Sequence, residues 1–416
     1  MPDNAGILQL VPRGDADAAD EVRILVEGLD RRRYQPVVAG ELTPQMRERL
    51  SRQDIPWVYL AIPQTFSLQA YLTAAGQLRR LIQARDIALI HCHNMEATAV
   101  AVLACQSWGV GNSPPLVSTL HAPREGLAPT YHSWVRRVGT RWLLSRCHGL
   151  IVPSQHDQEQ ATQLAPHLQS RLHVVYPSLE RSPSRSLEAG IKRRQIGVHR
   201  DAAIIGLLSR LVQGQGIKSF LEAAAVINEE LPNIEFVIIG EGPGRQQLEE
   251  LAHKLGLSGS CVFLGTRRDI RQVIAALNIV VLLSDADRAA LRGLQALAGG
   301  LRVIAAPTPA LREIFGPMPG AELIETADSV QLAEALRRQL HITPQLEDSE
   351  LLLEERRSIT YRDFLVSTTV YDLERAWSSG TSASDQDVAI AQALEERFGP
   401  QRLVAEVESI YQNLGI

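Results

Sequence analysis

The sequence contains few aromatic residues and few cysteines for its length. Of its 416 residues, 5% are aromatic and four are cysteines: Cys92, Cys105, Cys147 and Cys261. No two of them have Cys-x-x-Cys spacing, which argues against a zinc site and against a disulfide framework. We therefore expect the four cysteines to be small buried side chains of a protein in a reducing compartment. The apolar content of 45% is that of a globular protein with a mainly aliphatic core.

The sequence also lacks a long hydrophobic run. The longest, Val273–Leu283, is too short to span a bilayer and contains Asn278. The segment Met1–Gly6 has neither the basic nor the apolar region of a signal peptide. A formal net charge of -5 gives no electrostatic reason to expect nucleic-acid binding. These features predict a cytoplasmic protein without a nucleic-acid partner.

The order of apolar and amphipathic stretches predicts an α/β fold. A chain of 416 residues is too long for one ordinary core, so we expect two domains. Short apolar runs alternate with longer amphipathic stretches, which is typical of parallel strands separated by helices. The predicted strands are Ile7–Val11, Gln35–Gly40, Trp57–Ile62, Ile87–His91, Leu116–Leu120, Gly149–Val152, His173–Tyr176, Ile204–Ser209, Ile234–Gly240, Val262–Gly265, Ile279–Leu283, Arg302–Ala305 and Glu322–Ile324.

The pattern occurs twice, before and after a segment rich in Ser, Pro and Arg. This segment, Pro177–His199, is predicted to be a linker. Two such α/β series predict two Rossmann-like, doubly wound domains that face a cleft. The final amphipathic helix is predicted at Pro400–Leu414, and Trp377–Gln386 is predicted to be a flexible polar stretch.

Four phrases in the second half carry a family resemblance. They are GLLSRLVQGQGI at Gly206–Ile217, FVIIGEGPGRQQLEELAHKLGL at Phe236–Leu257, VFLGTRRDI at Val262–Ile270 and LQALAGGLRVIA at Leu294–Ala305. In this order they resemble the C-terminal domain of the family-4 (group 1) retaining glycosyltransferases, which have the GT-B fold. The first half is similar to the family more loosely, through IALIHCHN, VSTLHA and GLIVPSQ.

The resemblance implies a domain division and a function. It implies an acceptor-side N-terminal domain at 1–180, a nucleotide-sugar donor domain at 200–395, and a helix at 396–416 that returns to the first domain. The implied reaction is transfer of a sugar, with retention, from a nucleotide diphosphate donor to a glycan or lipid-linked acceptor, as in polysaccharide biosynthesis. It implies no cofactor and no metal for the chemistry.

Stabilisation of the leaving diphosphate requires positive charge. The family has the pattern Arg-Leu-x-x-x-Lys-Gly after the first strand of its second domain. Here Arg210 and Leu211 are kept, and Gln215 occupies the Lys position. The resemblance thus assigns Arg210 a phosphate role, whereas Arg210 alone would be interpreted as a surface cation.

Two further loops are implied to bind the donor. The run Gly240–Gly244 connects a predicted strand to a helix, so its Gly240 and Gly242 either admit a ligand or simply shape the turn. Arg267 and Arg268 lie where the family loop contacts the nucleobase, and both are alternatively solvated surface charges.

The carboxylate pair of the family is altered in this sequence. Alignment places Asp287 where a Glu faces the transferred sugar, and Gln295 where a second Glu holds the ribose. Gln295 still offers a donor and an acceptor to hydroxyl groups. Leu291, between them, is also implied to contact the donor. The glycines of the family turn are replaced here by Arg288 and its neighbours. Taken over the whole chain, the resemblance implies His121, Arg210 and Asp287 as the catalytic residues.

The first half contributes a histidine and a loop. His121 is expected to end the fifth strand beside the donor sugar, the alternative being a structural role. The loop Pro12–Asp17, with Arg13 and Gly14, is expected to approach the acceptor and, being acidic, to repel anionic acceptors. His91 and His93 are two residues apart in a predicted strand region, a spacing that would suit a metal site. The sequence pattern offers no third ligand, so a zinc site is rejected.

The stretch Tyr131–Arg146 combines tryptophans with arginines. Such a helix either contacts an anionic membrane at its inner face or packs on the sheet with solvated arginines. The altered residues also leave open a non-catalytic homologue that binds a nucleotide or glycan as the subunit of a partner. A sugar-nucleotide epimerase and a dinucleotide-dependent oxidoreductase fit less well, since no Gly-x-Gly-x-x-Gly follows the first strand.

Overall fold

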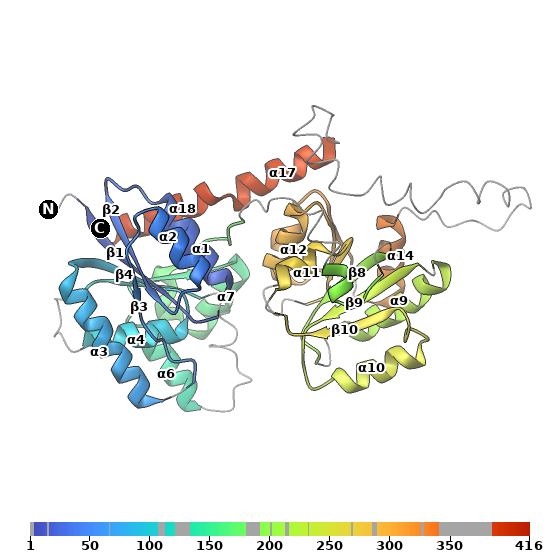
Figure 1. Cartoon of the computed structure of the whole chain (residues 1–416), viewed down its shortest axis with the longest axis horizontal. Coiled ribbons are helices and arrows are strands. Elements are labelled where there is room, and N and C mark those ends of the chain that lie inside the picture. Colours follow the sequence, from blue (N-terminus) through green and yellow to red (C-terminus); the bar gives the residue numbers. More distant parts are fainter. Residues whose placement is uncertain are drawn as a thin grey trace, which may run out of the picture. The chain divides into compact units, whose positions relative to one another are not determined.

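The computed structural model describes residues 4–14, 16–65, 67–106, 113–120, 134–179, 192–199, 202–212, 216–231, 233–267, 269–284, 289–325, 328–340 and 385–416. Contacts divide the chain into two compact units (Figure 1). Unit 1 comprises Met1–Glu180 with Glu396–Ile416, and unit 2 comprises Arg181–Glu395. The first unit is therefore built from both ends of the chain.

Unit 1 contains a seven-stranded parallel sheet in the order β3-β2-β1-β4-β5-β6-β7. Its strands are β1 (Ala5–Val11), β2 (Tyr34–Gly40), β3 (Trp57–Tyr59), β4 (Ile87–Cys92), β5 (Leu116–Thr119), β6 (Gly149–Val152) and β7 (Leu172–Val174). Its helices are α1 (Ala16–Gly28), α2 (Pro44–Arg52), α3 (Leu68–Ala84), α4 (Met95–Gln106), α6 (Trp134–Leu144), α7 (Gln155–Leu164), the 3-10 helix η1 (Pro166–Arg171) and α18 (Pro400–Asn413).

Unit 2 contains a six-stranded parallel sheet in the order β10-β9-β8-β11-β12-β13. Its strands are β8 (Ala203–Leu208), β9 (Ile234–Ile239), β10 (Cys261–Gly265), β11 (Ile279–Leu282), β12 (Arg302–Ala305) and β13 (Ala321–Leu323). Its helices are α9 (Ile217–Glu230), α10 (Arg245–Lys254), α11 (Ile270–Ala275), α12 (Ala289–Ala298), α13 (Pro309–Phe315) and α14 (Ser329–Gln339), and α17 (Asp385–Phe398) leads back to unit 1.

Local chemistry sets where several helices begin. Thr43, Ser67, Ser154 and Thr308 cap α2, α3, α7 and α13, each accepting a hydrogen bond from a backbone amide of the first turn. Such caps satisfy amides that have no partner within the helix. Strands β1, β8 and β9 are buried on both faces, which agrees with their nearly continuous apolar sequences.

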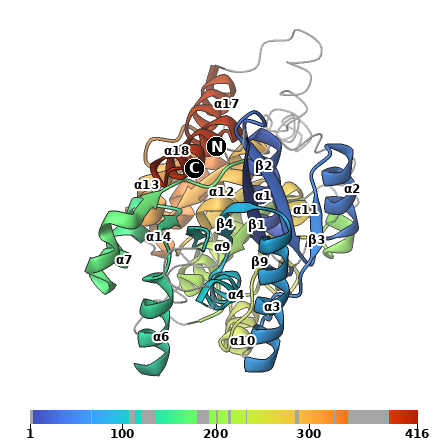
Figure 2. The ribbon, with the colours of Figure 1, turned by 90° about the vertical axis from the view of Figure 1, so that its left-hand side faces the viewer.

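The two faces of the first sheet are covered by different helices. Leu8 and Leu10 of β1 pack in one cluster with residues of α3 and α4. Ile7 of β1 packs on the opposite face with α1 and with Leu403, Val404, Val407, Ile410 and Tyr411 of α18. Figures 1 and 2 show α18 beside α1 against this sheet. The last helix is thus a structural part of unit 1.

The prediction of two Rossmann-like domains with a C-terminal helix is confirmed, whereas several predicted elements have different ends. β3 stops at Tyr59 instead of Ile62, and β5 stops at Thr119 instead of Leu120. Asp17 lies in the first turn of α1 and is only 9% exposed, so it is not part of an acidic loop as predicted. The first residues of α17 overlap the stretch expected to be flexible.

Candidate functional site

The second sheet has a point where its strand order reverses. β8 lies between β9 and β11, so consecutive connections leave it on opposite sides. In doubly wound sheets, ligands bind outside the carboxyl ends of the strands at this point. The residues that follow β8 and β11 are Ser209–Val212 and Leu283–Ser284, and they form the centre of the candidate site.

Arg210 follows β8 and has an exposed side chain. Its backbone carbonyl accepts a hydrogen bond from Val212, but its guanidinium has no hydrogen bond or ion pair with another described residue. The structure therefore places Arg210, the cation expected from the family pattern, at the reversal point of the second sheet.

The glycines after β9 make room for the Arg210 loop. Gly240 has a φ of +144°, and a Cβ atom there would lie 1.9 Å from the carbonyl oxygen of Ser209. A Cβ atom at Gly242 would lie 2.3 Å from the carbonyl oxygen of Leu211. The Leu211 amide donates to Glu241 O, and its carbonyl accepts from Gly244 N at 2.8 Å. Of the two alternatives from the sequence, the described contacts favour shaping of the turn, because the close neighbour is protein backbone.

Arg267 is held by a neighbouring carboxylate. Its Nε and Nη2 donate to the two oxygens of Asp269 at 2.9 and 2.8 Å. Lys192 Nζ lies 2.5 Å from the same carboxylate, although Lys192 is only 7% exposed. The hydrogen bond from Arg267, with that from Lys192, holds the pKa of Asp269 well below its usual range. Arg267 is thus paired with a carboxylate and is not a free solvated charge. Lys192 lies in none of the family phrases, and Asp269, although it lies in the phrase at Val262–Ile270, was not assigned a role from the sequence.

Helix α12 presents the other predicted donor residues. Leu291 and Gln295 are one turn apart and both are partly exposed. Gln295 Oε1 accepts a hydrogen bond from Arg292 Nη1 at 3.0 Å. Nearby in sequence, Ser284 is 8% exposed, and its hydroxyl has no hydrogen-bond partner in the described part of the chain. Ser284 is a polar group at the reversal point that the motif comparison did not single out.

Three predicted site residues, His121, Gln215 and Asp287, lie outside the described residues, as do Arg268 and Arg288. The prediction that His121 ends the fifth strand is corrected in one respect, because β5 already ends at Thr119. The roles assigned to these residues stay predictions.

The predicted acceptor-side loop follows β1. Arg13 is exposed and its Nε lies 3.2 Å from a carboxylate oxygen of Glu41. The carbonyl of Arg13 accepts a hydrogen bond from Gln64 Nε2 at 2.7 Å. Gly14 has a φ of +72°, a conformation that favours glycine. The loop is thus bonded to Glu41, which follows β2, and to Gln64, which follows β3. Asp17 belongs to α1.

A chain of buried polar side chains crosses the core of unit 1. Gln9 Nε2 donates to the Tyr411 hydroxyl at 3.0 Å, and Gln9 Oε1 accepts from His93 Nε2 at 2.7 Å. The Tyr411 hydroxyl lies 2.7 Å from His91 Nδ1, and His91 Nε2 lies 2.8 Å from Thr119 Oγ1. Gln9, His91, His93 and Tyr411 have no exposed surface. The two histidines face the same side, with ring centroids 4.2 Å apart, as the strand spacing predicted.

Two observations concern metals and membranes. Within the described ranges, no group of three or more His, Cys, Asp or Glu side chains is placed to hold a metal ion. No helix among these residues is long and apolar enough to cross a membrane. On α6, Val138 is 47% and Trp142 44% exposed, and the guanidinium of Arg146 lies 5.1 Å from the centre of the Trp142 ring.

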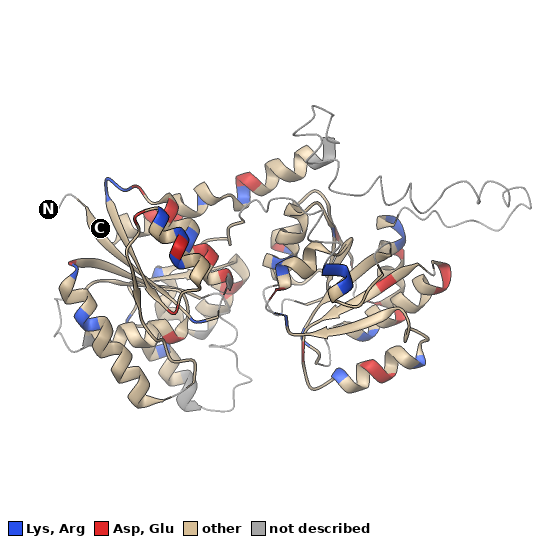
Figure 3. Cartoon of the chain, in the orientation of Figure 1, with Lys and Arg blue, Asp and Glu red and all other residues tan. Residues whose placement is uncertain are grey.

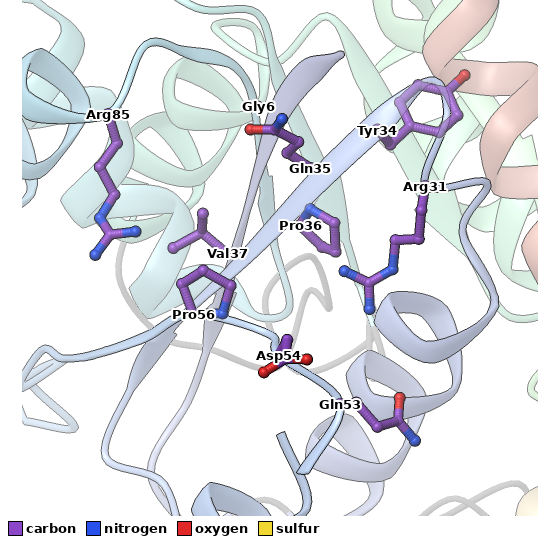
Figure 4. Close-up of a pocket in the computed structure, with 10 residues that line it drawn as sticks. All are labelled: Gly6, Arg31, Tyr34, Gln35, Pro36, Val37, Gln53, Asp54, Pro56 and Arg85. Atoms are coloured by element: carbon purple, nitrogen blue, oxygen red, sulfur yellow. The ribbon is translucent and has the colours of Figure 1, made fainter. Parts of the chain in front are cut away.

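A cavity of about 510 Å³ lies at the opposite edge of the first sheet (Figure 4). Its lining includes the first residues of β1 and β2, with Arg31, Asp54 and Arg85 around them. Partial burial lowers the pKa of Arg31. Because this cavity is at the amino ends of the strands, it is separate from the carboxyl edge where the predicted acceptor loop lies.

Comparison with known proteins agrees with this geometry. The family "Glycosyl transferases group 1" matches residues 189–351, and "Glycosyltransferase Family 4" matches residues 22–181. These matches support a group 1 glycosyltransferase. The matched ranges include Arg210, the glycine turn and the Lys192–Asp269 pair.

Individual relatives are distant in sequence. EpsD of Bacillus subtilis is 25% identical over 279 residues, which cover 66% of this chain and 73% of EpsD. D-inositol 3-phosphate glycosyltransferase of Mycobacteroides abscessus is 25% identical over 263 residues, covering 60% of this chain. That alignment spans 57% of the relative, which is less than two thirds of its length.

Solved structures share the fold over nearly the whole chain. Anabaena Alr3699/HepE in complex with UDP and glucose has a TM-score of 0.64 at 19% identity, covering 98% of this chain and 99% of that one. Sucrose-phosphate synthase of Thermosynechococcus elongatus has a TM-score of 0.62 at 16% identity, covering 99% of both chains. The glycosyltransferase GT-B fold is therefore the fold of this chain.

Proposed function

We propose that this protein transfers a sugar from a nucleotide diphosphate donor to a glycan or lipid-linked acceptor, with retention of the anomeric configuration. The observation that carries the proposal is Arg210, an exposed guanidinium at the reversal point of the second sheet without a partner among the described residues. A cation in this place stabilises the diphosphate as it leaves and gains negative charge.

The remaining roles follow from the family pattern. Asp287 is proposed to face the transferred sugar and His121 to lie beside it, while Gln295 bonds the ribose hydroxyls. Leu291, one turn before Gln295 on α12, is proposed to contact the donor. Gln215 bonds a phosphate oxygen as a neutral amide, so Arg210 supplies the charge. The proposed chemistry requires no metal and no cofactor.

The acceptor side is proposed to work at the inner face of a membrane. Helices α3 and α6 both pack against α4, and Figures 1 and 2 show the three helices side by side. Their exposed apolar residues include Leu68 and Leu72 on α3 and Val138 and Trp142 on α6. Arginines accompany the tryptophan, a combination that suits an anionic interface. Helices α1 and α2, by contrast, carry basic and acidic residues side by side (Figure 3).

A ligand screen tests the donor site first. UDP, ADP and GDP, their glucose conjugates and the dinucleotide NAD are added separately, and the thermal midpoint is recorded. A ligand at 100 times its Kd should stabilise the folded protein by about 2.7 kcal/mol. NMR of the product formed with the best donor then reports the anomeric configuration. Stabilisation only by dinucleotides would contradict the proposal, and an inverted product would contradict retention.

A second experiment separates an enzyme from a nucleotide-binding subunit. Donor hydrolysis is measured without acceptor for the wild type and for the double variant Gln215→Lys, Asp287→Glu. Lys restores charge against the diphosphate, and Glu restores reach to the sugar, so the variant should be faster if groups were merely lost. A slower variant would mean that the exchanges suit a working enzyme. Nucleotide binding without turnover in either protein would contradict the catalytic role.

A further inference from the structure

We propose that Lys192 and Asp269 are positioning residues for the donor nucleobase. The inference rests on the proposed donor site, in which the loop Gly265–Asp269 faces the base. Neither residue touches the nucleotide in this proposal. Lys192 acts through Asp269, and Asp269 acts through the backbone of the loop that it closes.

The charge arrangement is the first reason. Asp269 receives two hydrogen bonds from Arg267 and a contact of 2.5 Å from Lys192 Nζ. The Lys192 side chain is only 9% exposed, while the Asp269 side chain is 30% exposed. Lysine is seldom buried without a partner, because removal of its charge from water costs free energy. The ion pair therefore holds the side chains of both Lys192, in the predicted linker, and Asp269 in place.

The second reason is the backbone path from Asp269 to the diphosphate. Asp269 lies directly before α11, at the end of the loop that leaves β10. In that loop, the carbonyl of Gly265 accepts from Gly240 N at 3.1 Å. In the turn after β9, Glu241 O accepts a hydrogen bond at 3.0 Å from Leu211 N, which lies in the same loop as Arg210. The loops after β8, β9 and β10 are thus one hydrogen-bonded structure, and Lys192 anchors its outer end.

The third reason is that Lys192 differs from the other anchors of the linker. Arg193 donates to the carbonyls of Ala276 and Ala202 at 3.0 and 3.1 Å, and to Asn278 Oδ1. His199 contacts Glu235. These partners precede β11 and β8 or lie in the first half of β9, near the amino ends of the strands. Lys192 contacts the carboxyl edge instead, where the donor binds.

The proposal predicts different effects on the binding of the nucleobase and on the binding of the phosphates. Loss of the Lys192 charge releases Asp269 and loosens the base loop, whereas Arg210 stays in place because its loop is hydrogen-bonded to the turn after β9 through Leu211. Affinity for a nucleoside diphosphate should therefore fall, and affinity for inorganic pyrophosphate should not. A charge pair with one partly exposed member corresponds to a change in Kd of up to about fivefold.

The test measures Kd by titration calorimetry for the tightest binder among UDP, ADP and GDP, and for pyrophosphate by displacement. Lys192→Met keeps the apolar stem without the charge, and Lys192→Arg keeps the charge. Asp269→Asn removes the charge from the other side, so the pair can be tested even if Lys192→Met does not fold. Lys254→Met changes an exposed lysine at the end of α10 and serves as the matched control.

We expect weaker nucleotide binding in Lys192→Met and Asp269→Asn, recovery in Lys192→Arg and no change in the control. Donor KM should rise in Lys192→Met while kcat stays within about twofold. Wild-type nucleotide affinity in both charge-removing variants would overturn the inference and leave the donor site standing. An equal loss for pyrophosphate would also overturn it. A wild type that binds no nucleotide would overturn the proposed function itself.

Discussion

Arg210 and Arg267 are both arginines at strand ends of the same sheet, and their surroundings give them different roles. Arg267 makes a bidentate contact with Asp269, which neutralises it locally. Arg210 has no such partner among the described residues. An anion would have to compete with Asp269 for Arg267, and no described carboxylate competes for Arg210, so we expect Arg210 to be the cation that binds the diphosphate at lower cost.

Arg210→Ala should weaken nucleoside diphosphate binding by about 1.5–3 kcal/mol, the usual contribution of a hydrogen bond to a charged group. Titration calorimetry measures the loss, and unfolding should be nearly unchanged because the side chain is exposed. Lys254→Ala, which removes a positive charge from the end of α10, is the control. Equal affinity in Arg210→Ala and the wild type would place the diphosphate elsewhere.

Sequence reasoning identified Arg210 because a motif surrounds it, and it missed Lys192 because none does. Lys192 and Asp269 are 77 residues apart in the chain, and only folding brings them together. The same applies to Gln9 and Tyr411, which are 402 residues apart. Polar residues inside apolar strands, such as Gln9 and His91, were the available signal for the buried chain in unit 1. Their partners could not be read from the pattern.

At the scale of elements, the turn after β9 supports the loop after β8. Gly240 and Gly242 allow the carbonyls of Ser209 and Leu211 to approach closely. The turn therefore determines the path of the backbone on both sides of Arg210. Any side chain at these positions has to displace that backbone, since the contact is with a carbonyl group and not with a flexible side chain.

Gly242→Ala should lower both nucleotide affinity and stability, because its Cβ atom would lie 2.3 Å from Leu211 O. We expect destabilisation of about 1–3 kcal/mol, as for other overpacked sites. Urea denaturation and calorimetry on the same protein measure the two effects. Gly259→Ala is the matched control, because a Cβ atom there has no neighbour within 4 Å. Similar results for both variants would show that the turn is not constrained as described.

The elements themselves were largely predictable where pattern and capping agree. The amphipathic pattern of the sequence predicts a helix at Leu68–Ala84, and α3 has these same bounds, since Ser67 caps its start. The edge strands β3 and β7 differ from their predicted bounds, because the apolar residues that follow them, Leu60 and Ile62 after β3 and Val175 after β7, are buried in the core beyond the end of regular pairing. Helix α13 was not predicted, being a short segment that begins with Pro309 after its cap Thr308.

At the scale of the whole molecule, unit 1 depends on the last helix. Five residues of α18 pack with β1, β4, β5 and β6, and Tyr411 completes the hydrogen bonds of Gln9 and His91. Burial raises the pKa of Tyr411, so its hydroxyl stays protonated over the ordinary pH range. A protonated hydroxyl both donates and accepts, which is what its two neighbours require.

Tyr411→Phe should therefore destabilise unit 1 by about 1–3 kcal/mol, because it leaves buried polar groups without a partner. Tryptophan fluorescence during urea denaturation is a suitable probe, since Trp57 and Trp142 lie in this unit. Tyr59→Phe removes the hydroxyl of a tyrosine that is 66% exposed, and should change stability by less than about 0.5 kcal/mol. Equal stabilities of the two variants would contradict the role of the buried chain.

Unit 1 is formed by two segments that are far apart in the sequence, and this affects its folding during synthesis. Synthesis at roughly 5–20 residues per second separates Glu180 from Tyr411 by about 10 to 50 seconds. During this interval the sheet face formed by Ile7, Leu89 and Val117 lacks the helix that covers it. We therefore expect this apolar face of nascent unit 1 to bind chaperones until α18 has been synthesised and packs against it.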